Sequence, residues 1–174
     1  MIDLSLFLLF YAIIYLIKCN RKRGSKMTRL QTLKAIENAR LAHIAQMEKV
    51  NALIEGKSVR NLTAVEKTEC EFGKWFYAEG DFLKSLLGAQ FYKSIDAIHE
   101  YWHIEYEKIY DIFVYEANGS FVAKMLGYYH ISQKDMDEVL KYYNELKITS
   151  KDLLDALEAS KRRVLALKDS KFTS

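Results

Sequence analysis

Four side chains in this sequence have the types and the spacing of metal ligands. His99 and His103 lie four residues apart, so on a helix both imidazoles project from one face and can share one ion. His43 lies within an apolar stripe, and Cys70 lies between His43 and the pair. Three imidazole nitrogens and one thiolate sulfur form a tetrahedral donor set suited to zinc. The pattern therefore suggests one Zn²⁺ bound by His43, Cys70, His99 and His103.

The same residues also have an ordinary structural interpretation. A core histidine is most often held by a hydrogen bond, and a cysteine within a helix behaves as a small apolar residue. Burying three imidazoles and a thiol in one small core without a metal is costly, because each group needs a partner. From the residues alone, a zinc site and a metal-free core both stay open.

Long helices are the elements that must position these ligands. The chain has 174 residues and no proline, and half of it is hydrophobic. This composition favours long uninterrupted helices and argues against a β-sandwich, a disordered chain or a disulfide-stapled miniprotein. The predicted fold is all-α, an antiparallel four-helix bundle. Its helices are expected at about Thr28–Ile54, Thr63–Ala78 with a short piece to Leu87, Phe91–Ala117 and Ser132–Leu167, with an uncertain short helix at 121–130.

The second of these helices is predicted from a capping box. In Thr63-Ala-Val-Glu66, the threonine and glutamate side chains would each satisfy a backbone N–H at the helix start. A helix that begins at Thr63 places Cys70 in its middle. The first and third helices then supply His43 and the His99/His103 pair to the same point.

The amino-terminal segment differs from the rest of the chain. Leu4 to Ile17 is almost entirely apolar, and five basic residues follow it by position 26. We predict a membrane anchor at 1–19 (a short transmembrane or signal-anchor helix), a basic linker at 20–27 and the bundle at 28–170. The positive-inside rule then predicts an inner-membrane protein with its bundle in the cytoplasm. A signal peptide and a cytoplasmic protein starting at Met27 are the alternatives. The body is nearly neutral, so no nucleic-acid partner is expected.

One hexapeptide carries a resemblance to a known family. Cys70-Glu71-Phe72-Gly73-Lys74-Trp75 resembles the Cys-x-(Leu/Phe)-Gly-x-Trp signature of the chemoreceptor zinc-binding (CZB) domain. A preceding histidine, here His43, and a following His-x-x-x-His complete that family's set. The tail around 150–154 is also similar to the family's last helix. The resemblance covers roughly residues 30–165.

The resemblance implies a function as well as a fold. The family is a four-helix bundle, often dimeric, that binds zinc through three histidines and one cysteine. It accompanies bacterial chemoreceptors or diguanylate cyclases, and it responds to zinc or to hypochlorous acid acting on the zinc-bound cysteine. We therefore expect a non-enzymatic sensory domain in bacterial signalling or chemotaxis, with a homodimer and a signalling protein as partners.

This sequence departs from the family's pattern in three places. It has neither a methyl-accepting coiled coil nor a GGDEF motif, so the usual outputs are missing. Gln46 stands where the family often has an aromatic residue, and the stretch after His103 is long. A non-sensory zinc-binding interaction module therefore stays open as the alternative.

Residues near the predicted ligands have expected supporting roles. Gly73 would let a neighbouring helix approach the thiolate, and Trp75 would anchor packing. Asp96 and Glu107 fall within about 80° of the histidine face of their helix. We interpret them either as acceptors for imidazole N–H groups or as solvated charges.

Two other metal-site patterns match the same segment. His99-Glu100-Tyr101-Trp102-His103 fits H-E-x-x-H of zincin metalloproteases, in which the glutamate is a general base and water takes an open metal position. A site closed by cysteine leaves no such position, so this is a remote alternative. The paired spacing Asp96/His99 and Glu100/His103 also suits a di-iron bundle, but that architecture places the two motifs on different helices.

Overall fold

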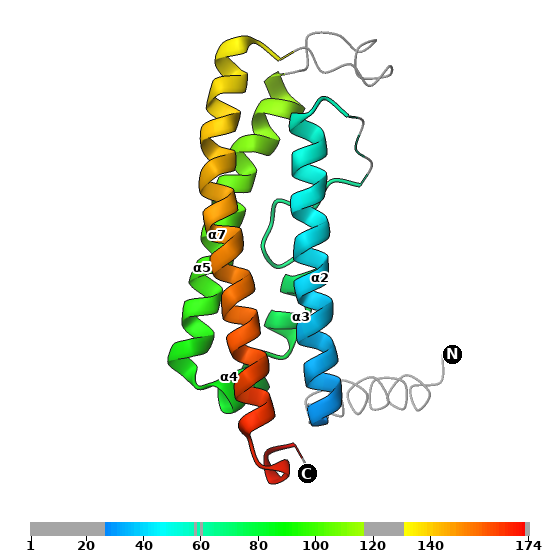
Figure 1. Ribbon diagram of the computed structural model, residues 1–174, viewed down its shortest axis with the longest axis vertical. Helices are drawn as coiled ribbons and strands as arrows, with labels where there is room; N and C mark the ends of the chain where they lie inside the picture. The colour runs from blue at the N-terminus through cyan, green and yellow to red at the C-terminus, as the bar shows by residue number, and fades with distance from the viewer. Residues whose placement is uncertain (1–26, 58, 60, 117–130, 173–174) are drawn as a thin grey trace, which may run out of the picture.

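The computed structural model describes residues 27–57, 59, 61–116 and 131–172, and all regular structure within these ranges is helical. Three long helices lie along the long axis of the molecule (Figure 1). Of the two short helices, one packs on the first long helix and the other packs on the remaining two. The all-α prediction is confirmed. The elements are α2 (Arg29–Ile54), α3 (Glu71–Ala78), α4 (Gly80–Leu87), α5 (Ala89–Asp111), the π-helical turn η1 (Ile112–Glu116), α7 (Gln133–Ala166) and the 3₁₀ turn η2 (Asp169–Lys171).

The helices alternate in direction, as expected for a helical bundle. In Figure 1 the chain ascends α2, descends through α3 and α4, ascends α5 and descends α7. The helix α5 packs along α7, and α2 packs on both α7 and α3. The second position of the bundle is therefore filled by two short helices and by the non-helical residues 61–70 that precede them.

Two predicted helix starts coincide with observed caps. The Thr28 hydroxyl accepts the backbone N–H of Gln31 at 3.2 Å, and the Gln31 side chain accepts the backbone N–H of Thr28 at 2.8 Å. At α7, the Ser132 hydroxyl accepts the backbone N–H of Asp135 at 3.2 Å. Local side-chain chemistry thus defines where α2 and α7 begin.

The predicted start of the second helix was wrong. The helix α3 begins at Glu71, and Cys70 is its N-cap residue, with extended backbone angles of φ −71° and ψ 158°. Cys70 therefore lies at the start of a helix and not in the middle of one. The direction of its side chain is set by the N-cap hydrogen bond to the Gly73 N–H. In the expected helix from Thr63, the position of Cys70 around the helix axis would have set that direction.

Tertiary hydrogen bonds explain why residues 63–69 do not continue the helix. The carbonyl oxygen of Thr63 accepts the hydroxyl of Tyr106 at 3.1 Å, and that of Val65 accepts Nδ1–H of His103 at 2.6 Å. In a helix these carbonyl oxygens would accept backbone N–H groups four residues ahead. Side chains of α5 have replaced those donors, so this segment is held by α5 instead of by its own backbone.

The core consists of two apolar clusters with the histidines between them. On α5, Ile95 belongs to one cluster and Trp102 to the other, and His99 lies between them. The first cluster includes Ile36, Phe72, Phe76, Leu83, Ile95, Leu153 and Leu157. The second includes Val50, Leu53, Trp102, Tyr106, Ile109, Val139 and Leu146. The candidate ligands are consequently in the middle of the bundle, away from both ends.

The predicted inner-membrane localisation is corrected. Among the helices within the described ranges, none combines the length and the apolar character needed to cross a bilayer. The reason is their composition, since charged residues recur along each long helix. The predicted anchor at 1–19 and the uncertain helix at 121–130 lie outside the described residues. The third predicted helix, expected to reach Ala117, changes to π-helical geometry after Asp111.

Candidate metal centre

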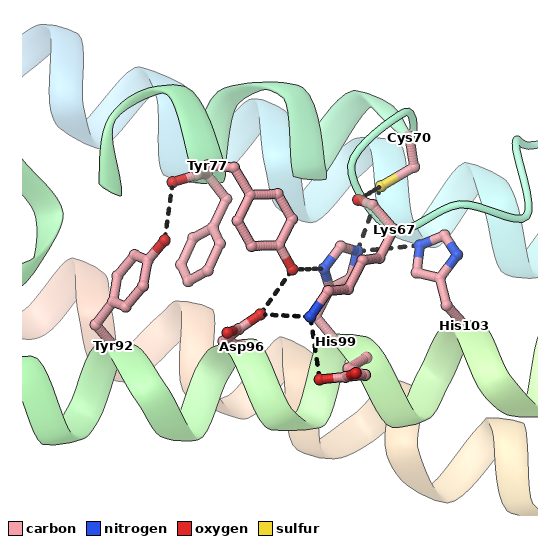
Figure 2. A network of polar contacts seen from close by, with 9 residues as sticks. Lys67, Cys70, Tyr77, Tyr92, Asp96, His99 and His103 are labelled. Carbon is pink, nitrogen blue, oxygen red and sulfur yellow. Dashed lines mark hydrogen bonds and ion pairs between the residues drawn. The ribbon is translucent and has the colours of Figure 1, made fainter. Parts of the chain in front are cut away.

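Two helices bring three predicted ligands to one point. His99 and His103 project from α5 toward Cys70 at the start of α3 (Figure 2). The Nε2 atom of His99 lies 3.3 Å from Sγ of Cys70 and 3.1 Å from Nε2 of His103. All three side chains are buried, and their three donor atoms lie within 4.8 Å of one another.

These separations match the donor spacing of a tetrahedral zinc ion. With Zn–N bonds of about 2.0–2.1 Å and Zn–S bonds of about 2.3 Å, neighbouring donors lie about 3.3–3.6 Å apart. The observed separations from His99 Nε2 are close to this range at both neighbours. One soft sulfur and two imidazole nitrogens are also the donor types that zinc prefers. The third separation, from Cys70 Sγ to His103 Nε2, is within 4.8 Å. The cluster therefore fits zinc binding in its donor types and in the two separations from His99.

Hydrogen bonds behind the two rings determine which nitrogens face the cluster. His103 donates Nδ1–H to the Val65 carbonyl oxygen at 2.6 Å. Tyr77 donates its hydroxyl hydrogen to Asp96 Oδ1 at 2.7 Å, and its oxygen lies 3.3 Å from Nδ1 of His99. A neutral imidazole has a single N–H, so His103 presents the lone pair of Nε2 to the cluster. The two Nε2 atoms lie 3.1 Å apart, so one cation can bind both of them.

Burial prepares the histidines and the cysteine differently. Desolvation lowers the pKa of His99 to about 2, with further lowering by His103, and burial also lowers the pKa of His103. Both rings are therefore neutral and ready to bind a metal at pH 7. Burial raises the pKa of the Cys70 thiol, against the lowering effect of nearby backbone N–H groups. The cysteine must lose a proton before it can bind as a thiolate.

The loop before α3 approaches Gly73 so closely that only glycine fits. A Cβ at Gly73 would lie 1.8 Å from the Lys67 carbonyl oxygen and 3.2 Å from Cys70 Sγ. The backbone N–H of Gly73 donates to that sulfur at 3.1 Å, and the thiol lies 3.4 Å from the Lys67 carbonyl. A close approach at Gly73 was expected, but from a neighbouring helix. The approaching backbone is instead the chain's own loop.

His43 reaches the same cavity from α2 but is held by another partner. Its Nε2 lies 2.7 Å from the Ser150 hydroxyl on α7, and both side chains are buried. His43 is not among the three residues whose donor atoms converge. Burial lowers the pKa of His43 to about 4, with a smaller contribution from His103, so this ring is also neutral. A cavity of about 210 Å³ is lined by all four predicted ligands and by Gln46 and Trp102, among others.

The carboxylates of α5 separate into different roles. Asp96 supports His99 through Tyr77 and also pairs with Lys67 Nζ at 3.1 Å (Figure 2). Glu107 is exposed, and none of its hydrogen bonds within the described chain reaches the cluster. Glu100 is also exposed and pairs with Lys67 at 3.0 Å. It does not line the cavity, which argues against the general base of a zincin protease.

Sequence reasoning missed the groups that orient the ligands. Tyr77 lies seven residues after Cys70, a spacing that predicts a shared helix face, but the contact of Tyr77 with His99 was not predicted. Ser150 had no assigned role. The Val65 carbonyl has no signature in a sequence at all, because every residue has one.

The comparison with protein families gives a match over the segment that carries this cluster. Residues 43–110 match the chemoreceptor zinc-binding domain. The match begins at His43 and includes Cys70, His99 and His103, so the resemblance drawn from the hexapeptide is confirmed over this segment. No curated protein and no solved structure gives a significant match to the chain. The CZB match and the buried cluster together fit zinc binding.

Proposed function

We propose that this chain is a zinc-binding sensory domain with a site of three histidines and one cysteine. Cys70, His99 and His103 form the converged part, and His43 is the fourth ligand from the wall of the same cavity. The convergence of one sulfur and two imidazole nitrogens in the buried core carries this proposal, because these are the donor types that zinc prefers. We assign residues 28–170 to this domain as part of the same proposal.

The metal content of the purified full chain tests the zinc site. We expect one zinc per chain by elemental analysis when no zinc is added, and loss of most of it in His99→Ala. His130→Ala is the matched control, because His130 is the only histidine of the chain outside the proposed set. Wild-type protein without zinc, with an affinity too weak to measure in titrations, would contradict the proposal.

The sensory role rests on the chemistry of Cys70. A zinc-bound thiolate is nucleophilic although its thiol is protonated in the metal-free protein. Hypochlorous acid would transfer oxygen to the sulfur, so that the thiolate becomes a sulfenic acid and the oxidant leaves as chloride. The sulfur then loses its negative charge and binds zinc more weakly. Its cap on the Gly73 N–H would weaken at the same time, so α3 would respond.

An oxidant titration separates the sensor from the plain zinc-binding module. With a sensor, one equivalent of hypochlorite should release zinc and change the circular dichroism spectrum, and Cys70→Ser should abolish the response. Cys19→Ser is the matched control, since these are the chain's two cysteines. Stoichiometric zinc that is unaffected by the oxidant would favour the non-sensory interaction module.

The remaining partners are proposed on the same basis. The change in helix packing would alter the interface of a homodimer. It would also alter the contact with a bacterial signalling or chemotaxis protein. Exposed apolar side chains on α5 and α7, including Tyr101, Ile104 and Ile148, offer surface for such contacts. Sedimentation of the full chain with and without zinc tests the dimer, and a monomer under both conditions would contradict it.

A further inference from the structure

His43 is held by a buried hydrogen bond that crosses the bundle. Its Nε2 lies 2.7 Å from Oγ of Ser150, which places a residue of α2 against the middle of α7. Each side chain is only 5% exposed. Water cannot readily replace either partner at such a position, so the bond restricts the orientation of the imidazole ring.

This orientation keeps His43 out of the converged cluster. The donor atoms of Cys70, His99 and His103 lie within 4.8 Å of one another, and neither nitrogen of His43 joins them. The rings of His99 and His103 differ in this respect, because their outer partners bind Nδ1 and leave Nε2 facing the cluster. Of the three histidines, His43 alone has Nε2 engaged by a partner outside the cluster.

We infer that Ser150 competes with the metal for His43. When His43 completes the zinc site through Nε2, that nitrogen leaves Ser150, and the buried link between α2 and α7 is broken. The inference rests on the proposed function, since it requires His43 as the fourth ligand. It gives Ser150 a role as a positioning residue of the metal-free state.

The competition connects the site to α7, which supplies none of the ligands. A second polar link between the same helices joins the Tyr143 hydroxyl to Asn51 Oδ1 at 3.1 Å, two turns away along α7. The loss of the Ser150 bond therefore loosens the contact locally without separating the helices. Because coupling is reciprocal, anything that favours the His43–Ser150 bond also weakens zinc binding.

Zinc affinity of Ser150→Ala in the full chain tests the competition. Removing the competing hydrogen bond should tighten zinc binding about fivefold, as measured by competition with a chromophoric chelator. Ser160→Ala is the matched control, because Ser160 is also buried on α7 but donates to the Ala156 carbonyl of its own helix. Unchanged or weaker binding in Ser150→Ala, relative to this control, overturns the inference.

A double-mutant cycle separates this inference from the function on which it rests. In a His43→Ala background, Ser150→Ala should have no effect on zinc affinity. If His43→Ala alone leaves zinc affinity unchanged, the four-ligand proposal fails. If His43→Ala weakens binding but Ser150→Ala does not tighten it, only the competition fails.

Nitrogen NMR of the unmodified protein gives a measurement that does not depend on any variant. With ¹⁵N-labelled histidine and bound cadmium or zinc, the competition requires that the metal-bound nitrogen of His43 is Nε2. The opposite arrangement, in which Ser150 orients the ring and the metal binds Nδ1, keeps the Nε2–Ser150 bond. Metal on Nδ1 would overturn the inference even if every variant failed to fold.

Discussion

The two sides of the candidate metal centre are built by different means. On α5, His99 and His103 occupy regular helical positions, and their spacing alone places both rings on one face. On the other side, Cys70 caps a short helix, and the residues before it follow no regular structure. The α5 side carries neutral ligands that are ready for a metal, whereas the Cys70 side depends on a loop and on the loss of a proton. The two sides should therefore respond differently to substitution and to pH.

The Cys70 side of the site is the easier side to disrupt. Of the substitutions considered, Gly73→Ala should have the largest effect on stability and on zinc binding. The added Cβ would overlap the Lys67 carbonyl oxygen at 1.8 Å, so the loop must move away from α3. We expect a loss of about 2–3 kcal/mol in the free energy of unfolding, measured in urea, and loss of zinc binding. Gly56→Ala is the control, because that glycine has positive φ but open space around it. It should cost about 1 kcal/mol and leave zinc affinity unchanged. A Gly73→Ala protein that binds zinc normally would show that the close approach of this loop does not matter for the site.

Particular residues show why one side was predictable and the other was not. The caps at Thr28 and Ser132 are local interactions, and they lie where α2 and α7 were predicted to begin. The shared face of His99 and His103 likewise follows from their four-residue spacing on a helix, without any contact to a distant segment. The capping box at Thr63 misled, because its backbone carbonyl is bound by Tyr106, 43 residues away. Hydrogen bonds to backbone groups over such distances leave no trace in residue types or spacing.

The protonation difference between the two sides predicts how zinc affinity depends on pH. Burial lowers the pKa values of His99 and His103, so neither ring releases a proton when zinc binds above pH 7. Burial raises the pKa of Cys70, so its thiol releases one proton. Zinc affinity should therefore rise about tenfold per pH unit between pH 7 and 9. In Cys70→Ser the affinity should be weaker and nearly independent of pH. A wild-type profile that is equally flat would show that the cysteine does not bind as a thiolate.

Residues that hydrogen-bond to the far side of the α5 histidine rings should have a smaller effect on zinc affinity. In Tyr77→Phe, His99 Nδ1–H loses the oxygen that accepts it, and the ring loses its fixed tautomer. We expect zinc affinity to fall about tenfold, measured by chelator competition. Tyr92→Phe is the matched control, since Tyr92 stacks on Phe76 of α3 and its hydroxyl donates to the Phe76 carbonyl oxygen, at 3.4 Å, and not to a ligand ring. Equal effects of the two variants would mean that Tyr77 contributes by packing alone.

The smallest effects should distinguish the two carboxylates that the helical pattern treated alike. Asp96 accepts the Tyr77 hydroxyl at 2.7 Å and is connected through it to His99, whereas Glu107 is exposed. Asp96→Asn keeps an acceptor but removes its charge, so zinc affinity should fall about threefold. Glu107→Gln should leave affinity the same within error, by the same chelator competition. A reduction in Glu107→Gln that equals the one in Asp96→Asn would indicate a long-range charge effect of the whole α5 surface. The contact through Tyr77 predicts that only the carboxylate connected to the ring matters.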